Sequence, residues 1–208
     1  MKIDLFVDIV CPWCRIGKQH LFQAMEQWSG EAVEVNIHAY QLDPNMPAEG
    51  VKLAKYFEKF GNPGMVKQMT DRVCEAGAQC GLHFDFNHVD HMPNTLRSHQ
   101  LIKLAPAEQK LTVLDGLYEA YFTKALDVYD MDVILDVAEQ AGMERADTRA
   151  RLEAGEGTEA VKEDLEFARR VGIQGVPFFI INDKYALSGA QPVEAFLNAF
   201  EKVGSQTS

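Results

Sequence analysis

Long apolar runs are missing from this sequence, and cysteines and basic residues are few. The most apolar stretch is the short VPFFII segment from Val176 to Ile181, whereas a membrane span needs about 18 apolar residues in a row, so we expect no membrane partner. Four cysteines in 208 residues are too few for a disulfide scaffold. Basic side chains number 20 against 31 acidic ones, and the resulting charge of −11 disfavours nucleic acid and anionic membranes as partners.

The amino-terminal segment MKIDLFVDIVCPWC leads directly into two cysteines, without the small-residue cleavage site of a signal peptide. We therefore expect a cytoplasmic protein. Hydrophobic residues make up 47% of the chain and charged residues 25%, which is typical of a folded globular protein. In a reducing compartment, a close pair of cysteines is more often catalytic or metal-binding than structural.

Hydrophobic spacing predicts a strand, a helix and a second strand at the start of the chain. Lys2 to Val10 is rich in β-branched and aromatic residues, as buried strands are. Apolar residues recur at helical spacing from Cys14 to Trp28, and apolar and polar residues alternate from Ala32 to Leu42. Pro12 suits a first helical turn, because an N–H would have no partner there. The sequence thus predicts a strand-helix-strand unit with a sharp turn before the helix.

The rest of the chain is predicted to be a helical block followed by a return to the sheet. Residues 51–157 are helix-like, with breaks at glycine and proline. Helices are then predicted at Thr158 to Val171 and Pro192 to Val203, and paired strands at Phe178 to Ile181 and Tyr185 to Ser188. We predict an α/β fold, in which residues 1–50 and 158–208 form a four-stranded mixed sheet with flanking helices. Residues 51–157 would be an inserted all-helical domain.

Cys11, Pro12, Trp13 and Cys14 form a C-x-x-C motif at the predicted strand-helix junction. This spacing lets the two sulfurs form and break a disulfide with little backbone movement. The helix amino terminus favours negative charge, so it should stabilise a Cys11 thiolate. Pro12 holds the turn, and Trp13 offers apolar surface to a docking substrate. Cys11 is therefore the candidate nucleophile, and Cys14, one turn into the helix, the candidate resolving thiol.

Other roles for the cysteines and histidines remain open but are less favoured. A zinc site usually needs a second C-x-x-C or two suitably spaced histidines, and neither is present, so we expect no metal. Cys74 lies on a predicted helix from Met65 to Ala78, and Cys80 follows six residues later. If both were helical they would be too far apart for a disulfide and would be buried or idle thiols, but a helix that ends between them leaves a second redox pair open. The His- and Asp-rich loop from His83 to His91 resembles a metal site, but its spacing and aromatic neighbours favour a packed connection.

Gly175-Val176-Pro177 immediately precedes the predicted strand from Phe178 to Ile181. A proline at the start of a strand can be cis, and the backbone of Val176 would then be free to pair with an extended substrate. The tripeptide alone is weak evidence, because a trans turn proline is commoner. Together with C-x-x-C at the first strand-helix junction it is more specific.

These residues resemble the thioredoxin superfamily, and more closely the FrnE-like branch of the DsbA family. The resemblance rests on VDIVCPWCRIGK from Val7 to Lys18 and on GVPFFIINDKYALSGAQP from Gly175 to Pro192. It also rests on a Pro-Asn-Thr segment with a following histidine, namely Pro93, Asn94, Thr95 and His99. It covers essentially the whole chain.

The resemblance implies a thioredoxin fold with an inserted helical domain and thiol-disulfide exchange activity. Cys11 would attack, Cys14 would resolve, and cis-Pro177 would lie beside them. The expected substrate-binding residues are Pro12, Trp13, Val176, Pro177, Asn94, Thr95 and His99. On physical grounds alone, however, Asn94 and Thr95 are a helix cap and His99 a polar residue on the helix surface.

One departure from the superfamily concerns the proton of the resolving thiol. Thioredoxin-like proteins commonly carry a buried acid six positions before the first cysteine, where this chain has Leu5. Asp8 and water remain the candidate proton acceptors for Cys14.

The leading functional hypothesis is a disulfide oxidoreductase acting on protein or small-molecule thiols and disulfides. The first alternative is a glutathione-dependent isomerase or transferase, as in the related 2-hydroxychromene-2-carboxylate isomerase and kappa-class glutathione transferase families. Those proteins use a single serine where this chain has the cysteine pair, which favours redox exchange here. The second alternative is a holdase that binds unfolded chains through an apolar groove. We expect no bound cofactor, with glutathione as the one candidate co-substrate.

Overall fold

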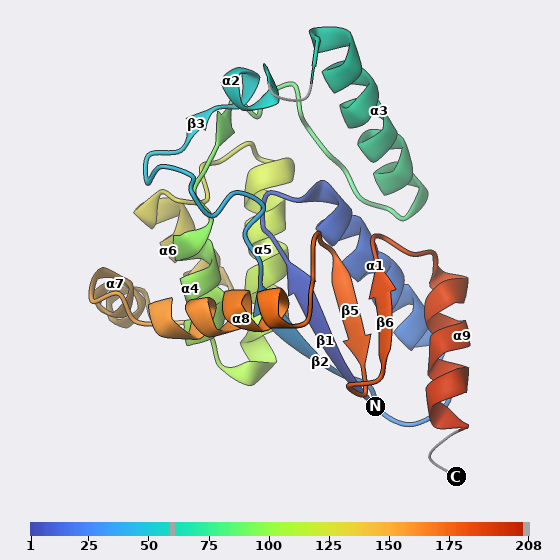
Figure 1. Cartoon of the computed structure of the whole chain (residues 1–208). Helices are drawn as coiled ribbons and strands as arrows, with labels where there is room; N and C mark the ends of the chain where they lie inside the picture. The colour runs from blue at the N-terminus through green and yellow to red at the C-terminus, as the bar shows by residue number, and fades with distance from the viewer. Residues whose placement is uncertain (59–60, 206–208) are drawn as a thin grey trace. The chain divides into compact units, whose positions relative to one another are not determined.

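The structure is a computed structural model, which describes residues 1–58 and 61–205 (Figure 1). Its strands are β1 (Lys2–Val7), β2 (Glu34–Ala39), β3 (Val51–Lys52), β4 (His91–Met92), β5 (Phe178–Ile181) and β6 (Tyr185–Ser188). Its α-helices are α1 (Pro12–Gln27), α2 (Leu53–Phe57), α3 (Pro63–Gln79), α4 (Leu96–Leu104), α5 (Lys110–Phe122), α6 (Met131–Gln140), α7 (Arg145–Glu153), α8 (Thr158–Arg170) and α9 (Val193–Gly204). A short 3₁₀ helix covers Ala107–Gln109.

The chain divides into two compact units. The first comprises residues 1–42 and 164–208, and the second comprises residues 43–163. The sequence placed these boundaries at 50/51 and 157/158. The helix α8 crosses the second boundary, so its last turns belong to the first unit. Among the described helices, none is long and apolar enough to cross a membrane.

The first unit contains the predicted four-stranded mixed sheet, in the order β2-β1-β5-β6. β1 runs parallel to β2, with Lys2 opposite Glu34, and antiparallel to β5, with Phe6 opposite Phe178. β5 and β6 are antiparallel, and they span the residues predicted from the sequence. The fold-class prediction is therefore confirmed for this unit.

Alternate side chains along β1 and β5 pack on opposite faces of the sheet. On one face, Phe6 forms a buried cluster with Ala168 of α8 and with Ile173. On the other face, Phe179 packs edge-on against Phe196 of α9, with ring centroids 4.8 Å apart. Figure 1 shows the sheet lying between α8 and α1. Both faces of β1 and β5 are thus packed, and this anchors the segments that follow β1 and precede β5.

The second unit is mostly helical, and its core forms around α5. Tyr118 and Phe122 are buried, and the Phe122 ring lies edge-on to Phe84 at 5.1 Å. A two-residue antiparallel ladder joins β3 and β4, with Val51 opposite Met92. The expected all-helical insertion therefore also contains a small sheet. Each strand has only two residues, which is too short to produce an alternating pattern in the sequence.

Candidate functional site

The turn between β1 and α1 places the first cysteine of the C-x-x-C motif at a helix start. β1 ends at Val7 rather than Val10, because the Asp8 carbonyl accepts a hydrogen bond from the Cys11 N–H at 3.2 Å and closes a turn. Cys11 is the N-cap, and its carbonyl accepts the Cys14 N–H at 3.0 Å. Pro12 occupies the first helical turn, which needs no N–H. The helix thus begins two residues earlier than the sequence pattern indicated.

The structure brings Cys11 together with the loop before β5. The Cys11 thiol donates a hydrogen bond to the Val176 carbonyl, with Sγ and O 3.5 Å apart, although the residues are 165 positions apart in sequence. The peptide bond between Val176 and Pro177 is cis. The Pro177 carbonyl accepts a hydrogen bond from the Gly189 N–H at 2.8 Å, which ties this loop to the end of β6. Beside Cys11, the Trp13 side chain is 40% exposed and offers apolar surface.

Cys14 differs from Cys11 in its surroundings. Its side chain is fully buried, and burial raises its pKa well above the ordinary value. A hydrogen bond to Cys11 and the charge of that residue raise the Cys14 pKa further, and the charge of Asp8 acts in the same direction. A hydrogen bond with the Asp8 backbone lowers the Cys14 pKa and offsets part of this rise. Cys14 is therefore a protonated thiol at neutral pH.

Asp8 is a buried carboxylate that joins the active-site turn to the end of β2. Its side chain is 1% exposed, and its two oxygens accept the N–H groups of Ile9 and Leu42, each at 2.8 Å. Burial of Tyr40, which lies in the same segment as Leu42, raises the pKa of that residue, and the charge of Asp8 raises it further. Leu5, six positions before Cys11, is buried and carries no charge. Asp8 is the acidic residue that acts on Cys14, through its backbone hydrogen bond and its charge.

A second buried polar group links β1, β2 and α8, and no pattern in the sequence indicates it. The His38 Nδ1 lies 2.8 Å from an Asp164 oxygen, and its Nε2 lies 3.1 Å from an Asp4 oxygen. The other Asp164 oxygen accepts the Ala39 N–H at 2.6 Å. The imidazole stacks on Phe6, with ring centroids 4.7 Å apart. Asp164 is 126 residues from His38, so no spacing rule could have joined them.

The predicted binding residues Asn94, Thr95 and His99 belong to the second unit. The Asn94 side chain donates to the Met46 carbonyl at 2.6 Å and accepts the Leu96 N–H at 2.9 Å. These bonds fix the start of α4. Thr95 is the N-cap of α4, but its side chain makes no capping hydrogen bond. Thr95 is 4% exposed and His99 is 1% exposed. The expectation that His99 lies on the helix surface was wrong, because α4 is buried on several sides.

Cys74, Cys80 and the loop from His83 to His91 belong to the second unit. All four cysteines of the chain are free thiols. The Cys74 thiol faces the Phe84 carbonyl at 3.7 Å, and the Cys80 thiol faces the Gly77 carbonyl at 3.3 Å. In the loop from His83 to His91, the Nδ1 of His88 lies 2.6 Å from Asp85. Within residues 1–58 and 61–205, no group of three or more His, Cys, Asp or Glu side chains is arranged to hold a metal ion.

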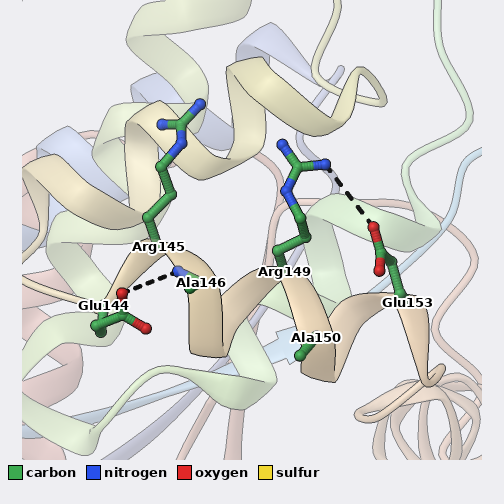
Figure 2. Close-up of a pocket in the computed structure, with 6 residues that line it drawn as sticks. All are labelled: Glu144, Arg145, Ala146, Arg149, Ala150 and Glu153. Carbon is green, nitrogen blue, oxygen red and sulfur yellow. Dashed lines mark hydrogen bonds and ion pairs between the residues drawn. The ribbon is translucent and has the colours of Figure 1, made fainter.

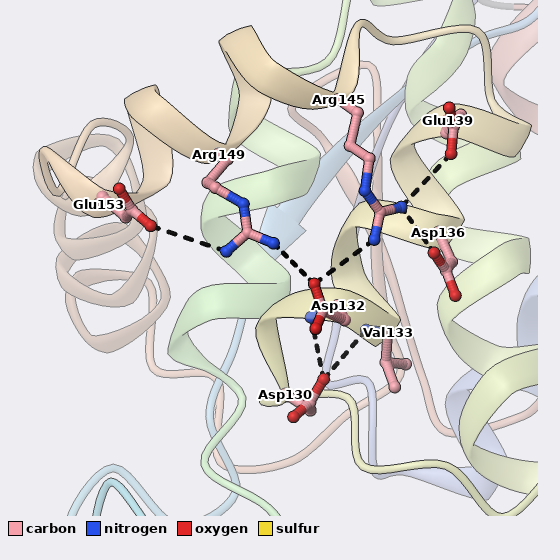
Figure 3. A network of polar contacts seen from close by, with 8 residues as sticks. All are labelled: Asp130, Asp132, Val133, Asp136, Glu139, Arg145, Arg149 and Glu153. Carbon is pink, nitrogen blue, oxygen red and sulfur yellow. Dashed lines mark hydrogen bonds and ion pairs between the residues drawn. The ribbon is translucent and has the colours of Figure 1, made fainter.

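A surface pocket of about 460 Å³ lies along α7 in the second unit (Figure 2). Its lining contains none of the predicted site residues: it consists of Glu144, Arg145, Ala146, Arg149, Ala150 and Glu153. Figure 3 shows that both arginines are engaged by carboxylates of α6. Asp132 bridges them, at 3.4 Å from Arg145 and 2.6 Å from Arg149. The lining of this pocket contains no cysteine.

Comparisons with known proteins show the family of this chain. Residues 2–201 match the model of the DSBA-like thioredoxin domain. The uncharacterized protein YwbO of Bacillus subtilis (strain 168) is 23% identical over 201 residues, which cover 96% of this chain and 95% of that protein.

Solved structures share the fold over nearly the whole chain. A structure described as a probable DsbA oxidoreductase, SCO1869 from Streptomyces coelicolor, superposes with a TM-score of 0.88 and 28% identity, over 97% of this chain and 89% of that one. The cytosolic disulfide reductase DsbM from Pseudomonas aeruginosa, solved with GSH, gives a TM-score of 0.68 at 16% identity, over 97% and 98% of the two chains. Because the family model spans almost all of the sequence, the chain belongs to the DSBA-like thioredoxin domain family.

Proposed function

We propose that this protein is a thiol-disulfide oxidoreductase in which Cys11 attacks the substrate and Cys14 resolves the mixed disulfide. The observation that carries the proposal is the difference between two thiols at one helix start. Cys11 lies at the N-cap, where a helix stabilises negative charge, and contacts the loop containing Val176. Cys14 is fully buried with a raised pKa, so it stays protonated while Cys11 reacts.

The proposed reaction transfers two electrons between thiols and a disulfide. The Cys11 thiolate attacks one sulfur of the substrate disulfide, and a bond forms between Cys11 and that sulfur while the second substrate sulfur leaves as a thiolate and takes up a proton. Cys14 then loses its proton and attacks the Cys11 sulfur, releasing the first substrate sulfur. The substrate is reduced and the protein gains a Cys11–Cys14 disulfide. In the opposite direction, the same steps oxidise a dithiol.

We place the substrate along the Val176–Pro177 loop, next to Trp13. An extended segment can pair with the backbone of this loop, since Val176 offers its carbonyl to Cys11 in the free protein. The exposed Trp13 ring would contact apolar substrate groups. Pro12 shapes this end of the helix, and Asn94, Thr95 and His99 remain predicted contributors from the second unit. Substrates would be protein or small-molecule thiols and disulfides, with glutathione as a candidate co-substrate.

A cytosolic location and a reducing direction form part of the proposal. They are supported by the description of the solved relative DsbM as a cytosolic disulfide reductase. Trapping with acid and alkylation of the thiols in intact cells would measure the share of Cys11 and Cys14 that is reduced. We expect both to be mostly reduced, and a mostly oxidised pair would contradict this part.

Insulin reduction with dithiothreitol tests the activity. We expect wild-type protein to accelerate the precipitation of insulin chains, and Cys11→Ser to fall to the rate of dithiothreitol alone, because the attacking sulfur is gone. Cys14→Ser should accumulate mixed disulfides on Cys11, which mass spectrometry identifies. Cys74→Ser is the matched control and should keep wild-type activity. An inactive wild type would reject the proposal, and equal suppression of aggregation by wild type and Cys11→Ser would favour the holdase alternative.

A further inference from the structure

We propose that His38 carries a positive charge at neutral pH and acts as a pH-sensitive clamp, which holds the end of β2 and α8 against β1. As an imidazolium it binds Asp4 through one ring nitrogen and Asp164 through the other. Loss of its proton at weakly alkaline pH releases one of these contacts. The inference does not depend on the proposed thiol exchange, because it concerns the packing of the first unit.

Both ring nitrogens of His38 face a carboxylate oxygen. Nδ1 lies 2.8 Å from an Asp164 oxygen, and Nε2 lies 3.1 Å from an Asp4 oxygen. A neutral imidazole donates through one nitrogen and carries a lone pair on the other, so one of the two carboxylates would face that lone pair. An imidazolium donates through both nitrogens. The charged form of His38 therefore satisfies both contacts at once.

Both carboxylates also accept hydrogen bonds from other donors, as ionised carboxylates do. The second Asp164 oxygen accepts the Ala39 N–H at 2.6 Å. The second Asp4 oxygen lies 3.0 Å from the Lys2 ammonium, and the first also accepts the Asn36 side-chain amide at 3.3 Å. Asp4 is 2% exposed and Asp164 is 7% exposed, so water screens their charges little. Two negative charges on either side of an imidazole favour its charged form.

The aromatic rings around His38 suit a cation as well. The Phe6 ring is stacked on the imidazole, with ring centroids 4.7 Å apart. The Phe167 ring of α8 meets the imidazole edge-on, with ring centroids 5.8 Å apart. A cation over an aromatic face is attracted by the quadrupole of the ring. The charge of His38 is thus stabilised from the sheet and from the helix that covers it.

Further charged groups surround this cluster. Lys2 is flanked by Asp183, with an oxygen 3.9 Å from its Nζ, and by Glu34, which is opposite Lys2 on β2. The Arg170 guanidinium of α8 lies 5.6 Å from the centre of the Phe167 ring. Together with Asp4 and Asp164, four carboxylates stand against the two cations Lys2 and Arg170. A positive charge on His38 reduces this negative excess.

The clamp joins segments that also carry the cysteine site. Ala39 ends β2, and Phe167 packs together with Val176 against the buried cluster of Phe6, Ala168 and Ile173. The Val176 carbonyl in turn accepts the Cys11 thiol. Release of the clamp should therefore loosen the end of β2, the part of α8 that belongs to the first unit, and the loop that follows it.

Long-range ¹H–¹⁵N correlation NMR spectra report the protonation state of His38 directly. The two ring nitrogens of an imidazolium have similar ¹⁵N shifts, whereas those of a neutral ring differ widely. At pH 7.5, an unperturbed imidazole is about 10% charged. We expect similar shifts for both nitrogens of His38 at this pH. The signals that are missing from His38→Gln identify this residue among the six histidines. A neutral His38 at pH 7.5 would overturn the proposal.

Asp164→Asn is the matched variant. Its side-chain oxygen can still accept the Ala39 N–H, while its amide can donate to Nδ1. A neutral His38 that donates through Nε2 to Asp4 then satisfies every contact, so we expect a neutral ring at pH 7.5. A ring that stays charged would contradict the role of the Asp164 carboxylate. If this variant does not fold, Asp4→Asn, whose amide can donate to Nε2, must show the same loss of charge.

Hydrogen exchange measured by mass spectrometry tests the clamp itself. An opened segment loses the His38 proton near pH 6.5, so opening of the wild type should become easier by up to about tenfold for each pH unit above this value. Intrinsic exchange rises with pH equally in wild type and in the neutral-ring variant, so the ratio of their rates isolates the clamp. Between pH 6.5 and about pH 8.5, we expect peptides from β2 and from residues 164–176 to gain exchange faster in the wild type.

Peptides from α5, in the second unit, are the internal control and should show the same pH dependence in both proteins. An equal pH dependence in the peptides from β2 and residues 164–176 would show that the proton of His38 does not hold these segments, and would overturn the clamp.

Discussion

At the residue scale, the buried Cys14 thiol makes the stability of the reduced protein depend on pH. The folded protein raises the pKa of Cys14 above the ordinary value of 9.0, so it retains a proton that the unfolded chain loses. Stabilisation by this proton is complete below about pH 9 and is lost as the pH rises towards the folded pKa. For one proton, the free energy of unfolding should fall by up to about 1.4 kcal/mol per pH unit in this window.

Urea unfolding of the reduced protein between pH 7 and pH 10 measures this dependence. Cys14→Ala is the comparison, since it keeps Tyr40 and Lys2, whose pKa values are also raised. We expect the wild type to lose stability more steeply than Cys14→Ala above pH 9. The protein with a Cys11–Cys14 disulfide has no Cys14 thiol to titrate and should follow the shallower slope. Parallel slopes for the reduced wild type and Cys14→Ala would contradict a raised Cys14 pKa.

At the scale of elements, the approach of α1 to the Pro177 loop depends on one glycine. A Cβ added to Gly17 would lie 2.8 Å from the Pro177 Cγ and 3.3 Å from the Ala190 Cα, too close to both a rigid ring and the backbone. Alanine normally stabilises a helix relative to glycine. Here we expect Gly17→Ala to lower the free energy of unfolding by about 1–3 kcal/mol through overpacking. It should also slow insulin reduction, because the loop that faces Cys11 must move.

Gly175→Ala is the control for this substitution. Gly175 lies in the same loop, and an added Cβ there would meet nothing within 4 Å. Its urea midpoint and insulin reduction rate should stay near those of wild type. If Gly17→Ala were as stable and as active as Gly175→Ala, the close packing of α1 on the loop would not control the site.

The same elements show which features could be predicted from the sequence. β5 and β6 were predicted to the residue because the Asn182-Asp183 turn separates two apolar runs, and both turn residues adopt positive φ. The β3–β4 pair was missed because two-residue strands give no periodicity, and their partners come from distant segments. His99 was placed on a surface because its helix carries polar residues, yet Ser98, His99 and Gln100 are all buried. Helical spacing cannot indicate that a helix is enclosed.

The candidate site was predictable only where its residues form a motif. Cys11 and Cys14 are adjacent in sequence to the turn that holds them, so spacing alone indicated their chemistry. The contact between Cys11 and Val176 joins segments 165 residues apart, and its place was expected only from family resemblance. The Asp4, His38 and Asp164 group and the bracing of Leu42 by Asp8 depend on tertiary pairing, which no local pattern encodes.

At the scale of the whole molecule, the hydrogen bonds described above at the cysteine site join residues within 1–42 and 164–208. These include the contacts of Cys11 with Val176 and of Asp8 with Leu42. The ends of the two segments are also close, since the Ala39 N–H donates to the Asp164 side chain at 2.6 Å. A short glycine-rich linker can therefore join Leu42 to Asp164 without stretching the chain. The sheet and its flanking helices would keep their hydrophobic core, in which Phe6, Phe179 and Phe196 are fully buried.

We predict that a protein with such a linker in place of residues 43–163 folds and keeps a reactive Cys11. In stopped-flow reaction with 5,5′-dithiobis(2-nitrobenzoate), its Cys11 should release thionitrobenzoate at a rate within about tenfold of the rate of the full chain. This corresponds to a difference of at most about 1.4 kcal/mol in activation free energy. Insulin reduction should fall further, if Asn94, Thr95 and His99 contribute to substrate binding as expected. The full-length Asn94→Ala variant is the control for that contribution. It should slow insulin reduction without changing the rate at which Cys11 releases thionitrobenzoate. A linker variant that folds but reacts no faster than a free cysteine would show that the insertion is needed to build the site, and one that does not fold would refute the independence of the first unit.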